Sequence, residues 1–431
     1  FIKGGEMMFR QIARKTGIIL LVLLIFSPIN TAPKRGVNAQ GSGDELITGG
    51  YDFSLIQLED GSLWSWGANV YGQLGLGDDE NRLHPVKLNT KLDNKTMAKM
   101  LAGDQNVFAL TNDGKAYVWG GGVRGFSTYS QPTKLDAGFK VKDIAWTGVI
   151  QDINHHYSYA IVDGEGKVYV FGSSYHGTRG RGLSGHGSAE KCSETYTVSL
   201  SDIKPVLISA THEVCSHSEH HKKVKDGKEL TNVKLISGAA NARYYVAVTE
   251  NNDVYTWGQG HSLTAHKNPN IDVITGDIQK IVATKDKIYA LTSEKEVWEW
   301  EGREGRPTKL DISDVKDVVG YDQTVLVLKE NGMVYGKGKN DYGQLGNGLD
   351  ANISSLTYLG INDIKAVGLG YRHSLFIENN GKVFGMGWNS YRQLANANDG
   401  VLEEFTKIST ISGVDHIAAN AYTSYAVKDN Q

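Results

Sequence analysis

Apolar and polar residues alternate in short runs along most of this chain of 431 residues, and each run ends in a turn. The run from Leu63 to Trp66 has a period of two and follows Asp60-Gly61, two residues that tolerate the positive φ of a hairpin turn. The same unit of strand, Asx/Gly turn, second strand and final glycine recurs along the chain. Helical periodicity is almost absent, so the pattern predicts an all-β protein built from hairpins.

The hairpins recur at roughly fifty-residue intervals, which places the chain among repeat architectures. A further apolar strand precedes each hairpin, as in the segments that begin at Met100, Leu235 and Val367. Units of three or four short strands favour a β-propeller, in which neighbouring blades bury the apolar faces that one unit alone leaves exposed. The final glycines of the hairpins are Gly67, Gly120, Gly172, Gly258, Gly302, Gly338 and Gly387.

Three copies of the unit carry a longer shared motif. They read DGSLWSWGANVYGQLGLG at 60–77, NGMVYGKGKNDYGQLGNG at 331–348 and GYRHSLFIENNGKVFGMGWNSYRQL at 370–394. These segments resemble the repeat of the regulator of chromosome condensation family, and the resemblance extends over about residues 46 to 428. It implies a seven-bladed β-propeller, in agreement with the seven glycine-terminated hairpins.

The number of upstream strands leaves open how the ring closes. Seven hairpins are accompanied by eight such segments, because 46–58 opens the repeat region and 414–427 ends it. We expect both ends to close the ring by contributing to one composite blade. A surplus partial blade is the alternative.

The eye-catching glycines and tryptophans are interpreted as structural. Gly67 and Gly72 have the spacing of a phosphate-binding loop, but Gln73 and Leu74 replace the lysine and the hydroxyl that this chemistry needs. The repeat positions expected to shape backbone or fill the core are Gly61, Trp64, Trp66, Gly67, Gly72, Gly75, Gly114, Trp119, Gly120, Trp257, Gly258, Gly332, Gly343, Gly346, Gly370, His373, Gly381 and Gly387.

The N-terminal residues predict export. Arg10, Arg14 and Lys15 precede the ten-residue apolar run 17–26, and small residues follow before Gln40, as in a secretory signal peptide. We therefore expect 1–39 to be a translated leader plus signal peptide of a bacterial protein, with synthesis beginning near Met7, and 40–431 to be one propeller domain. Later apolar runs are too short for a membrane span, so none is expected in the mature form.

The net charge of the chain without 1–39 indicates which classes of partner are disfavoured. Without 1–39 the chain keeps 39 basic and 47 acidic residues, a net charge of −8. This sign disfavours general binding to nucleic acid or anionic membranes. The chain also holds 21 tyrosines and 8 tryptophans, residue types that are enriched at protein interfaces.

An insertion at about 176–230 interrupts the repeat and contains both cysteines of the chain. In a secreted protein a Cys192–Cys215 disulfide is the simplest expectation. A metal site is a weaker alternative because the spacing fits no standard zinc pattern, and a solvated polar loop is the third. The residues of the metal alternative are Cys215, His217, His220 and His221.

The sequence favours a secreted, non-enzymatic and monomeric protein-binding propeller without a cofactor, with the insertion marking the binding face. The resembled family has secreted bacterial members, among them the propeller-type β-lactamase inhibitor. A secreted carbohydrate hydrolase or lyase is the alternative, and it would require carboxylates at the propeller axis. Guanine-nucleotide exchange, implied by the family's eponymous member, is the least favoured because of the signal peptide and the acidic charge.

Overall fold

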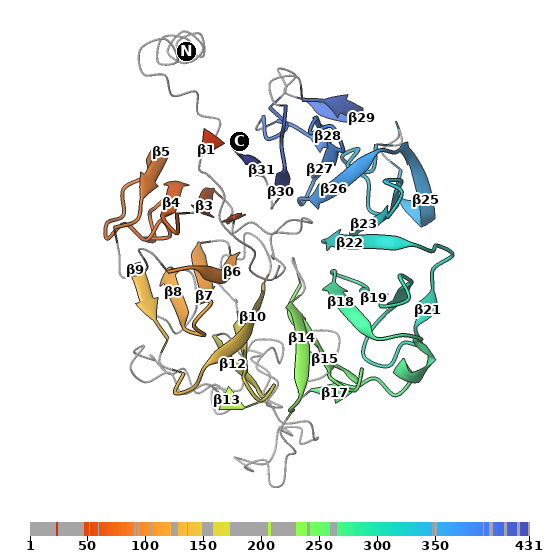
Figure 1. Ribbon diagram of the computed structural model, residues 1–431, viewed down its shortest axis with the longest axis horizontal. Helices are drawn as coiled ribbons and strands as arrows, with labels where there is room; N and C mark the ends of the chain where they lie inside the picture. The colour runs from red at the N-terminus through yellow and green to blue at the C-terminus, as the bar shows by residue number, and fades with distance from the viewer. Residues whose placement is uncertain are drawn as a thin grey trace, which may run out of the picture.

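Seven four-stranded antiparallel sheets surround a common centre as the blades of a β-propeller (Figure 1). This computed structural model describes residues 23–24, 47–50, 52–58, 60–89, 92, 95–103, 105–121, 128–135, 137–148, 158–172, 206–207, 230–238, 242–258, 265–346, 348, 351–390, 392–395, 400–408, 412–419 and 423–429. The prediction of an all-β, seven-bladed propeller is confirmed.

Within each blade the strands follow the order of the sequence from the centre to the rim. The first strands of blades 1 to 7 are β2 (Ile47–Gly49), β6 (Met97–Ala102), β10 (Val141–Thr147), β14 (Val233–Gly238), β18 (Ile278–Ala283), β22 (Val315–Tyr321) and β26 (Ile364–Leu369). The second strands are β3 (Phe53–Gln57), β7 (Asn106–Thr111), β11 (Ser158–Asp163), β15 (Tyr244–Thr249), β19 (Ile288–Thr292), β23 (Thr324–Lys329) and β27 (His373–Glu378).

The third strands carry the repeat glycines in every blade except blade 5, where Gly302 follows the end of β20, and the fourth strands form the rim. The third strands are β4 (Leu63–Gly67), β8 (Ala116–Gly120), β12 (Val168–Gly172), β16 (Val254–Gly258), β20 (Val297–Trp300), β24 (Val334–Gly338) and β28 (Val383–Trp388). The fourth strands are β5 (Arg82–Lys87), β9 (Tyr129–Lys134), β13 (Val206–Leu207), β17 (His266–Lys267), β21 (Thr308–Lys309), β25 (Ile353–Ile361) and β29 (Val401–Lys407). A short 3₁₀ helix (Ile271–Val273) lies between β17 and β18.

A hairpin of β30 (His416–Ala419) and β31 (Ser424–Asp429) fills the space between blade 7 and blade 1. The short strand β1 (Leu23–Leu24) pairs in parallel with β31 (Figure 1). It lies within the predicted signal peptide, so in an exported chain that begins at Gln40 this pairing is lost and the hairpin alone closes the ring. Residues 46–58, however, contribute β2 and β3 to the complete blade 1. The C-terminal hairpin is therefore the surplus partial blade, and a blade shared by 46–58 and 414–427 is not formed.

A separate apolar cluster lies between each pair of neighbours in the ring. Trp119 of blade 2 is fully buried against Leu74 and Leu88 of blade 1, and Trp257 of blade 4 packs with Val170 of blade 3. The hairpin is included on both sides, since Ile417 packs against blade 7 and Tyr425 against blade 1. Burial of apolar area on both faces of every sheet is the main force that holds the ring together.

Lysines of the first strands reach from each of blades 2 to 7 to the following blade. Lys99, with only 8% of its side chain exposed, contacts Asp143 at 2.7 Å and donates to the carbonyl of Ile144 at 2.6 Å. The more exposed pairs contribute about 0–1 kcal/mol each, so they supplement the apolar clusters. The other contacts are Lys142 with Glu250 and the Val233 carbonyl, Lys234 with Asp277, Lys280 with Asp317, Lys316 with the Lys365 carbonyl, and Lys365 with Asp415.

The two faces of the ring differ in their connections. We call the face where the third strands end the glycine face, and it also carries the links between first and second strands. The opposite face, the turn face, carries hairpin turns such as Asp60-Gly61 and Asn380-Gly381. On the glycine face Gly338 adopts a φ of +107°, and a Cβ there would lie 1.9 Å from the carbonyl oxygen of Gln323.

We predict that Gly338→Ala destabilises the protein by about 2 kcal/mol more than Gly138→Ala, because overpacking typically costs about 1–3 kcal/mol. Gly138 also has a positive φ, of +74°, but a Cβ there would meet nothing within 4 Å. The control therefore carries the conformational penalty alone, about 1–2 kcal/mol. Urea unfolding of both variants measures the difference, and equal losses would contradict the steric explanation.

Candidate interaction face

Three aromatic rings surround the guanidinium of Arg372 on the glycine face, at the junction of blades 6 and 7. Its Cζ lies 4.3 Å from the ring centre of Tyr342, and 5.0 Å from those of Tyr371 and Trp388. These four side chains, here called the arginine cluster, are all partly exposed. Cation–π contacts of this kind contribute about 0.5–1 kcal/mol at exposed sites. The cluster is thus an ordered surface of residue types that dominate binding hot spots.

The backbone fixes Arg372 and Trp388 side by side. The amide of Trp388 donates to the carbonyl of Arg372 at 2.8 Å, and His373 pairs with Gly387 in the ladder of β27 and β28. A Cβ on Gly387 would lie 2.4 Å from that same carbonyl oxygen. The repeat glycine therefore allows the third strand to approach the start of the second, which brings the two side chains together.

Tyr342 reaches the cluster from a loop of blade 6 that an asparagine organises. The side-chain oxygen of Asn340 accepts from the amide of Leu345 at 2.7 Å, and Leu345 is fully buried. The amide of Tyr342 donates to the side-chain oxygen of Gln344 at 3.0 Å. Asn69 and Leu74 make the same contact in blade 1 at 2.8 Å. The Asn-x-x-Gly-Gln-Leu motif thus stabilises a turn of the backbone. This turn exposes the tyrosine that precedes its glycine.

The predicted insertion is divided by a rim strand. The short strand β13 lies within the predicted insertion at about 176–230 and pairs with β12. The residues on either side of it, 173–205 and 208–229, lie outside the described part of the chain, so the insertion stays a prediction. Gly172 pairs with Ser158 as Gly387 pairs with His373, so β12 ends on the glycine face. Cys192, Cys215, His217, His220 and His221 lie outside the described residues, and their predicted roles stay predictions.

Among the described residues, no group of three or more His, Cys, Asp or Glu side chains is placed to hold a metal ion. One largely buried carboxylate, that of Glu299, forms ion pairs between blades and is therefore interpreted as structural. Glu299, with 11% of its side chain exposed, contacts Lys337 at 2.6 Å and Lys287 at 3.1 Å. Burial lowers the pKa of Lys287, but Glu299 and Glu301 outweigh this effect and leave it above its ordinary value. This group links blades 5 and 6.

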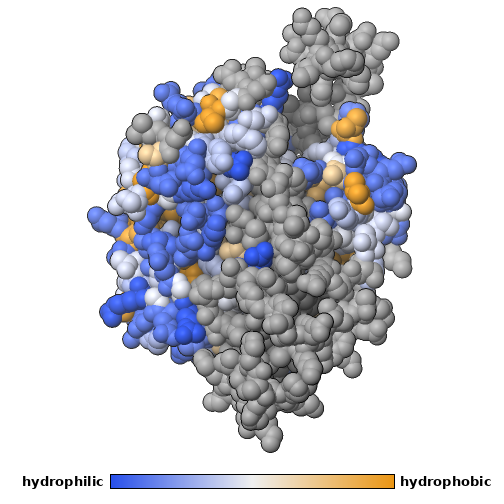
Figure 2. All heavy atoms as spheres, turned by 180° about the vertical axis from the view of Figure 1, so that it is seen from behind, coloured by the Kyte–Doolittle hydropathy of each residue, from blue (hydrophilic) through white to orange (hydrophobic). Residues whose placement is uncertain are grey.

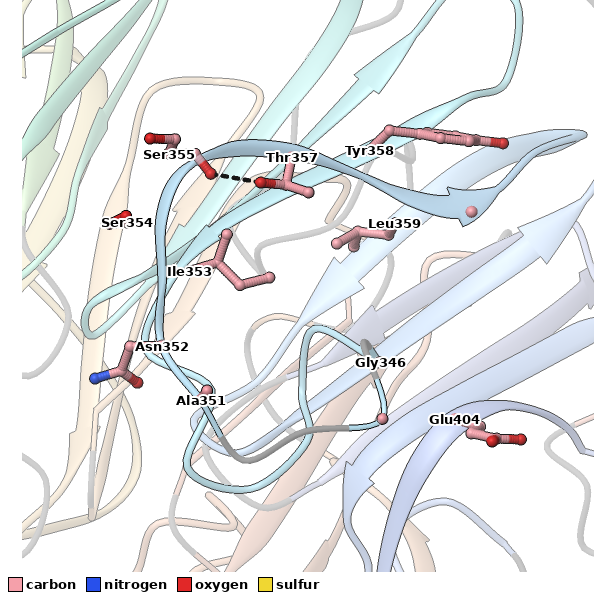
Figure 3. Close-up of a pocket in the computed structure, with 12 residues that line it drawn as sticks. Gly346, Ala351, Asn352, Ile353, Ser354, Ser355, Thr357, Tyr358, Leu359 and Glu404 are labelled. Carbon is pink, nitrogen blue, oxygen red and sulfur yellow. Dashed lines mark hydrogen bonds between the residues drawn. The ribbon is translucent and has the colours of Figure 1, made fainter.

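A groove of about 880 Å³ lies at the rim between β25 of blade 6 and β29 of blade 7 (Figure 3). Ile353 and Leu359 point from β25 into the groove, and Glu404 of β29 stands on its far side. Elsewhere, the described surface seen in Figure 2 is mostly hydrophilic, with apolar residues scattered among polar ones. Isolated apolar residues are normal on a protein surface. The groove and the arginine cluster are therefore the features that stand out.

His373 is buried completely and joins blade 7 to the closing hairpin. Its Nε2 lies 2.9 Å from the hydroxyl of Ser424, while the neighbouring Tyr425 donates to Ser54 of blade 1 at 3.0 Å. Successive residues of β31 thus bond to the blades on either side. Burial lowers the pKa of His373 to about 4, so the ring is neutral at physiological pH. Its environment is that of a structural histidine without access to substrate.

Sequence reasoning placed Gly370, His373 and Gly387 in the repeat but did not single out Arg372 or Trp388. The available signal was partial, since blades 1, 2 and 6 have Asp52, Gln105 and Gln323 where blade 7 has Arg372, but blade 4 also has an arginine there, Arg243. The described positions of the other expected structural residues fit backbone and core roles. Positive φ occurs at Gly61, Gly67, Gly72, Gly75, Gly114, Gly120, Gly258, Gly332, Gly343, Gly346, Gly381 and Gly387. Trp119 and Trp257 are buried, and Trp64 and Trp66 are partly buried beside the hairpin.

The fold and this face define a repeat-built β-propeller with a preorganised surface. A family model described as the regulator of chromosome condensation (RCC1) repeat matches residues 60–110 and 331–377. A second model of the same description matches 46–73, 315–344 and 364–393. The segments 46–110 and 315–393 are therefore repeats of the regulator of chromosome condensation type.

Relatives of known name share the repeat. The chain is 25% identical over 342 residues to the human E3 ubiquitin-protein ligase HERC2, covering 70% of this chain and 6% of HERC2. It is 28% identical over 211 residues to the zebrafish (Danio rerio) protein RCC2 homolog, covering 48% of this chain and 40% of the relative. The similarity thus spans only a small part of HERC2 and less than half of the RCC2 homolog.

Solved structures share the fold. Prp20p from Saccharomyces cerevisiae superposes with a TM-score of 0.54 at 17% identity, covering 89% of this chain and 82% of Prp20p. Human WBSCR16 gives a TM-score of 0.53 at 15% identity, covering 89% of this chain and 86% of that one. At these identities the likeness concerns the architecture alone.

We predict that His373 makes stability fall as the pH drops from 6.5 to 4. Over this range the unfolded chain binds a proton at His373, whereas the folded protein, with a pKa of about 4, resists it. The difference corresponds to about 3 kcal/mol, fully present above pH 6.5 and lost by pH 4. Between pH 7 and pH 4, the free energy of unfolding should fall by about 3 kcal/mol less in His373→Asn than in the wild type, as measured by urea titration. The exposed His84→Asn variant is the control, and parallel curves for both variants would refute the assignment.

Proposed function

We propose that this chain is a binding module for another protein, and that the arginine cluster on the glycine face is the centre of the contact. The observation that carries the proposal is the stacking of Arg372 against Tyr342, Tyr371 and Trp388. Tyr, Trp and Arg supply most of the energy in protein interfaces because they offer large area at a small cost in ordering. A ring of rigid blades presents them in one fixed arrangement.

The neighbouring structures support a role in protein binding. The Prp20p study reports binding to Gsp1p and histones, and a further solved structure has Kap60 bound to yeast RCC1 (Prp20). These partners belong to Prp20p. For this chain they favour the general class of interaction module, and the net charge of −8 predicted for 40–431 favours a protein over a nucleic acid as partner.

We further propose that the protein acts outside a bacterial cell. The support is the basic and apolar N-terminal pattern around the run 17–26. No helix among the described residues is long and apolar enough to cross a membrane. If the chain is exported as the 17–26 pattern indicates, its partner is a secreted protein, a cell-wall protein or a protein of a host.

The contact surface is tested by capture of partners from medium conditioned by the producing cells. Immobilised wild-type protein should retain a defined partner, and Trp388→Ala should weaken binding by about 2 kcal/mol, roughly 30-fold, as expected for an interface hot spot. Arg372→Ala should act in the same direction. Leu83→Ala is the matched control because Leu83 is 91% exposed on the rim strand β5 of blade 1. Equal capture by all four proteins would rule out the arginine cluster as the contact.

Export and the disulfide are tested together by the intact mass of the protein recovered from the medium. After alkylation without reduction, we expect a chain that begins at Gln40 and carries no label, because Cys192 and Cys215 are bonded to each other. A chain that stays in the cell with 17–26 intact contradicts export. A chain that takes up two labels contradicts the disulfide.

A further inference from the structure

The rim strand β25 is an open sheet edge that lacks three of the usual protections, namely charge, proline and short length. It is the longest of the described strands, with nine residues, and within the described part of the chain it pairs with β24 alone. Its sequence, ISSLTYLGI, contains no charged residue and no proline. Proteins normally blunt edge strands with charge, proline or short length, because free backbone groups recruit other chains.

Every other rim strand of the ring has such protection. Pro85 interrupts β5 and Pro132 interrupts β9. The strands β13, β17 and β21 have two residues each, and β29 carries Glu403, Glu404 and Lys407. Bulges interrupt the ladders of β5, β9 and β29 once each and that of β25 twice, so β25 keeps this form of protection and lacks the others. The missing charge and proline are therefore a local property of blade 6.

The same edge borders the groove of about 880 Å³ (Figure 3). Ile353 and Leu359 give it an apolar side, and both are only partly buried. Ser354, Ser355 and Thr357 of β25 are exposed along it. Across the groove the exposed Glu404 has no cationic partner among the ion pairs of the described residues. The groove thus combines an outer strand edge, two apolar contacts and one unneutralised carboxylate, while the Ser355 carbonyl of this edge accepts from the hydroxyl of Thr357 at 2.9 Å.

We propose that β25 binds an extended segment of a partner protein, which adds a strand to blade 6. In this mode the backbone supplies hydrogen bonds, and alternate side chains supply specificity. The segment places apolar residues against Ile353 and Leu359 and a lysine or arginine opposite Glu404. A second copy of this chain is a poorer occupant, because its own β25 brings no cation to Glu404.

The rim site is separate from the proposed contact on the glycine face. The groove is lined by β25, β29 and the loop around Gly346, whereas the arginine cluster uses Tyr342, Tyr371, Arg372 and Trp388. Either site can fail without the other. Arg372→Ala should therefore leave binding at the rim unchanged.

A random heptapeptide library displayed on phage tests the proposal on the full-length protein. Enriched peptides should alternate apolar and polar residues, contain a lysine or arginine, and lack proline. Synthetic copies should bind at least tenfold more weakly to Thr357→Lys and Glu404→Lys in fluorescence anisotropy. Thr308→Lys, an exposed threonine on the rim strand β21, is the matched control and should bind as the wild type does.

Three outcomes would overturn the proposal. They are a failure to enrich any peptide, enrichment of acidic or proline-rich peptides, and equal affinity for Thr357→Lys and Thr308→Lys. Sedimentation identifies the other occupant: a wild-type dimer that Thr357→Lys dissociates would assign the edge to a second copy of the chain. If Arg372→Ala abolishes peptide binding, the peptides occupy the glycine face, and the rim site is refuted while the glycine-face proposal stands.

Discussion

The structure depends on one constraint, which is that each blade has two apolar faces and each face needs a neighbour. A four-stranded sheet such as β6 to β9 cannot cover Phe108 and Trp119 by itself, because they pack toward opposite sides of the sheet, against blades 3 and 1. Stacking continues until the last sheet meets the first. The hairpin β30–β31 satisfies this condition because Ile417 and Tyr425 cover the two remaining faces. The ring is therefore closed by apolar burial, with Ser424 and Tyr425 adding polar contacts on each side.

Because the sheet faces are buried between blades, the residues available for binding lie at the strand ends and on the rim. The same glycine geometry recurs at the ends of the third strands of blades 1, 2, 4, 6 and 7, where the backbone approaches a carbonyl too closely for a side chain. The residues beside these glycines are free to vary, and at blade 7 they become Arg372 and Trp388. At the rim, the fourth strands need only one ladder each, so their outer edges are free. Charge, proline or short length protects these free edges from pairing with other chains everywhere in the described ring except at β25.

The local sequence correctly predicted the strands and turns of the repeated unit. Asp60-Gly61 and its counterparts specify hairpins because few residues accept positive φ, and period-two alternation sets which residues are buried. The glycines at the ends of the third strands were expected to be structural, and Gly67, Gly120, Gly258, Gly338 and Gly387 have the positive φ that such a role requires. Pattern could not assign 46–58 and 414–427, because both read as strands preceding a hairpin, and only packing determines which sheet each one joins. Nor could it place β13, which has two residues and no period of its own.

The sequence by itself determined the kind of unit, its number and the turn chemistry, since these depend on φ preferences and on neighbours a few residues away. The tertiary structure decided which residues meet. Tyr342 and Arg372 are thirty positions apart in the sequence. They are in contact because a loop of blade 6 packs against blade 7. Glu404 faces the β25 edge for a similar reason. Such contacts arise from the angle at which neighbouring sheets pack, a property of the closed ring that no single repeat encodes.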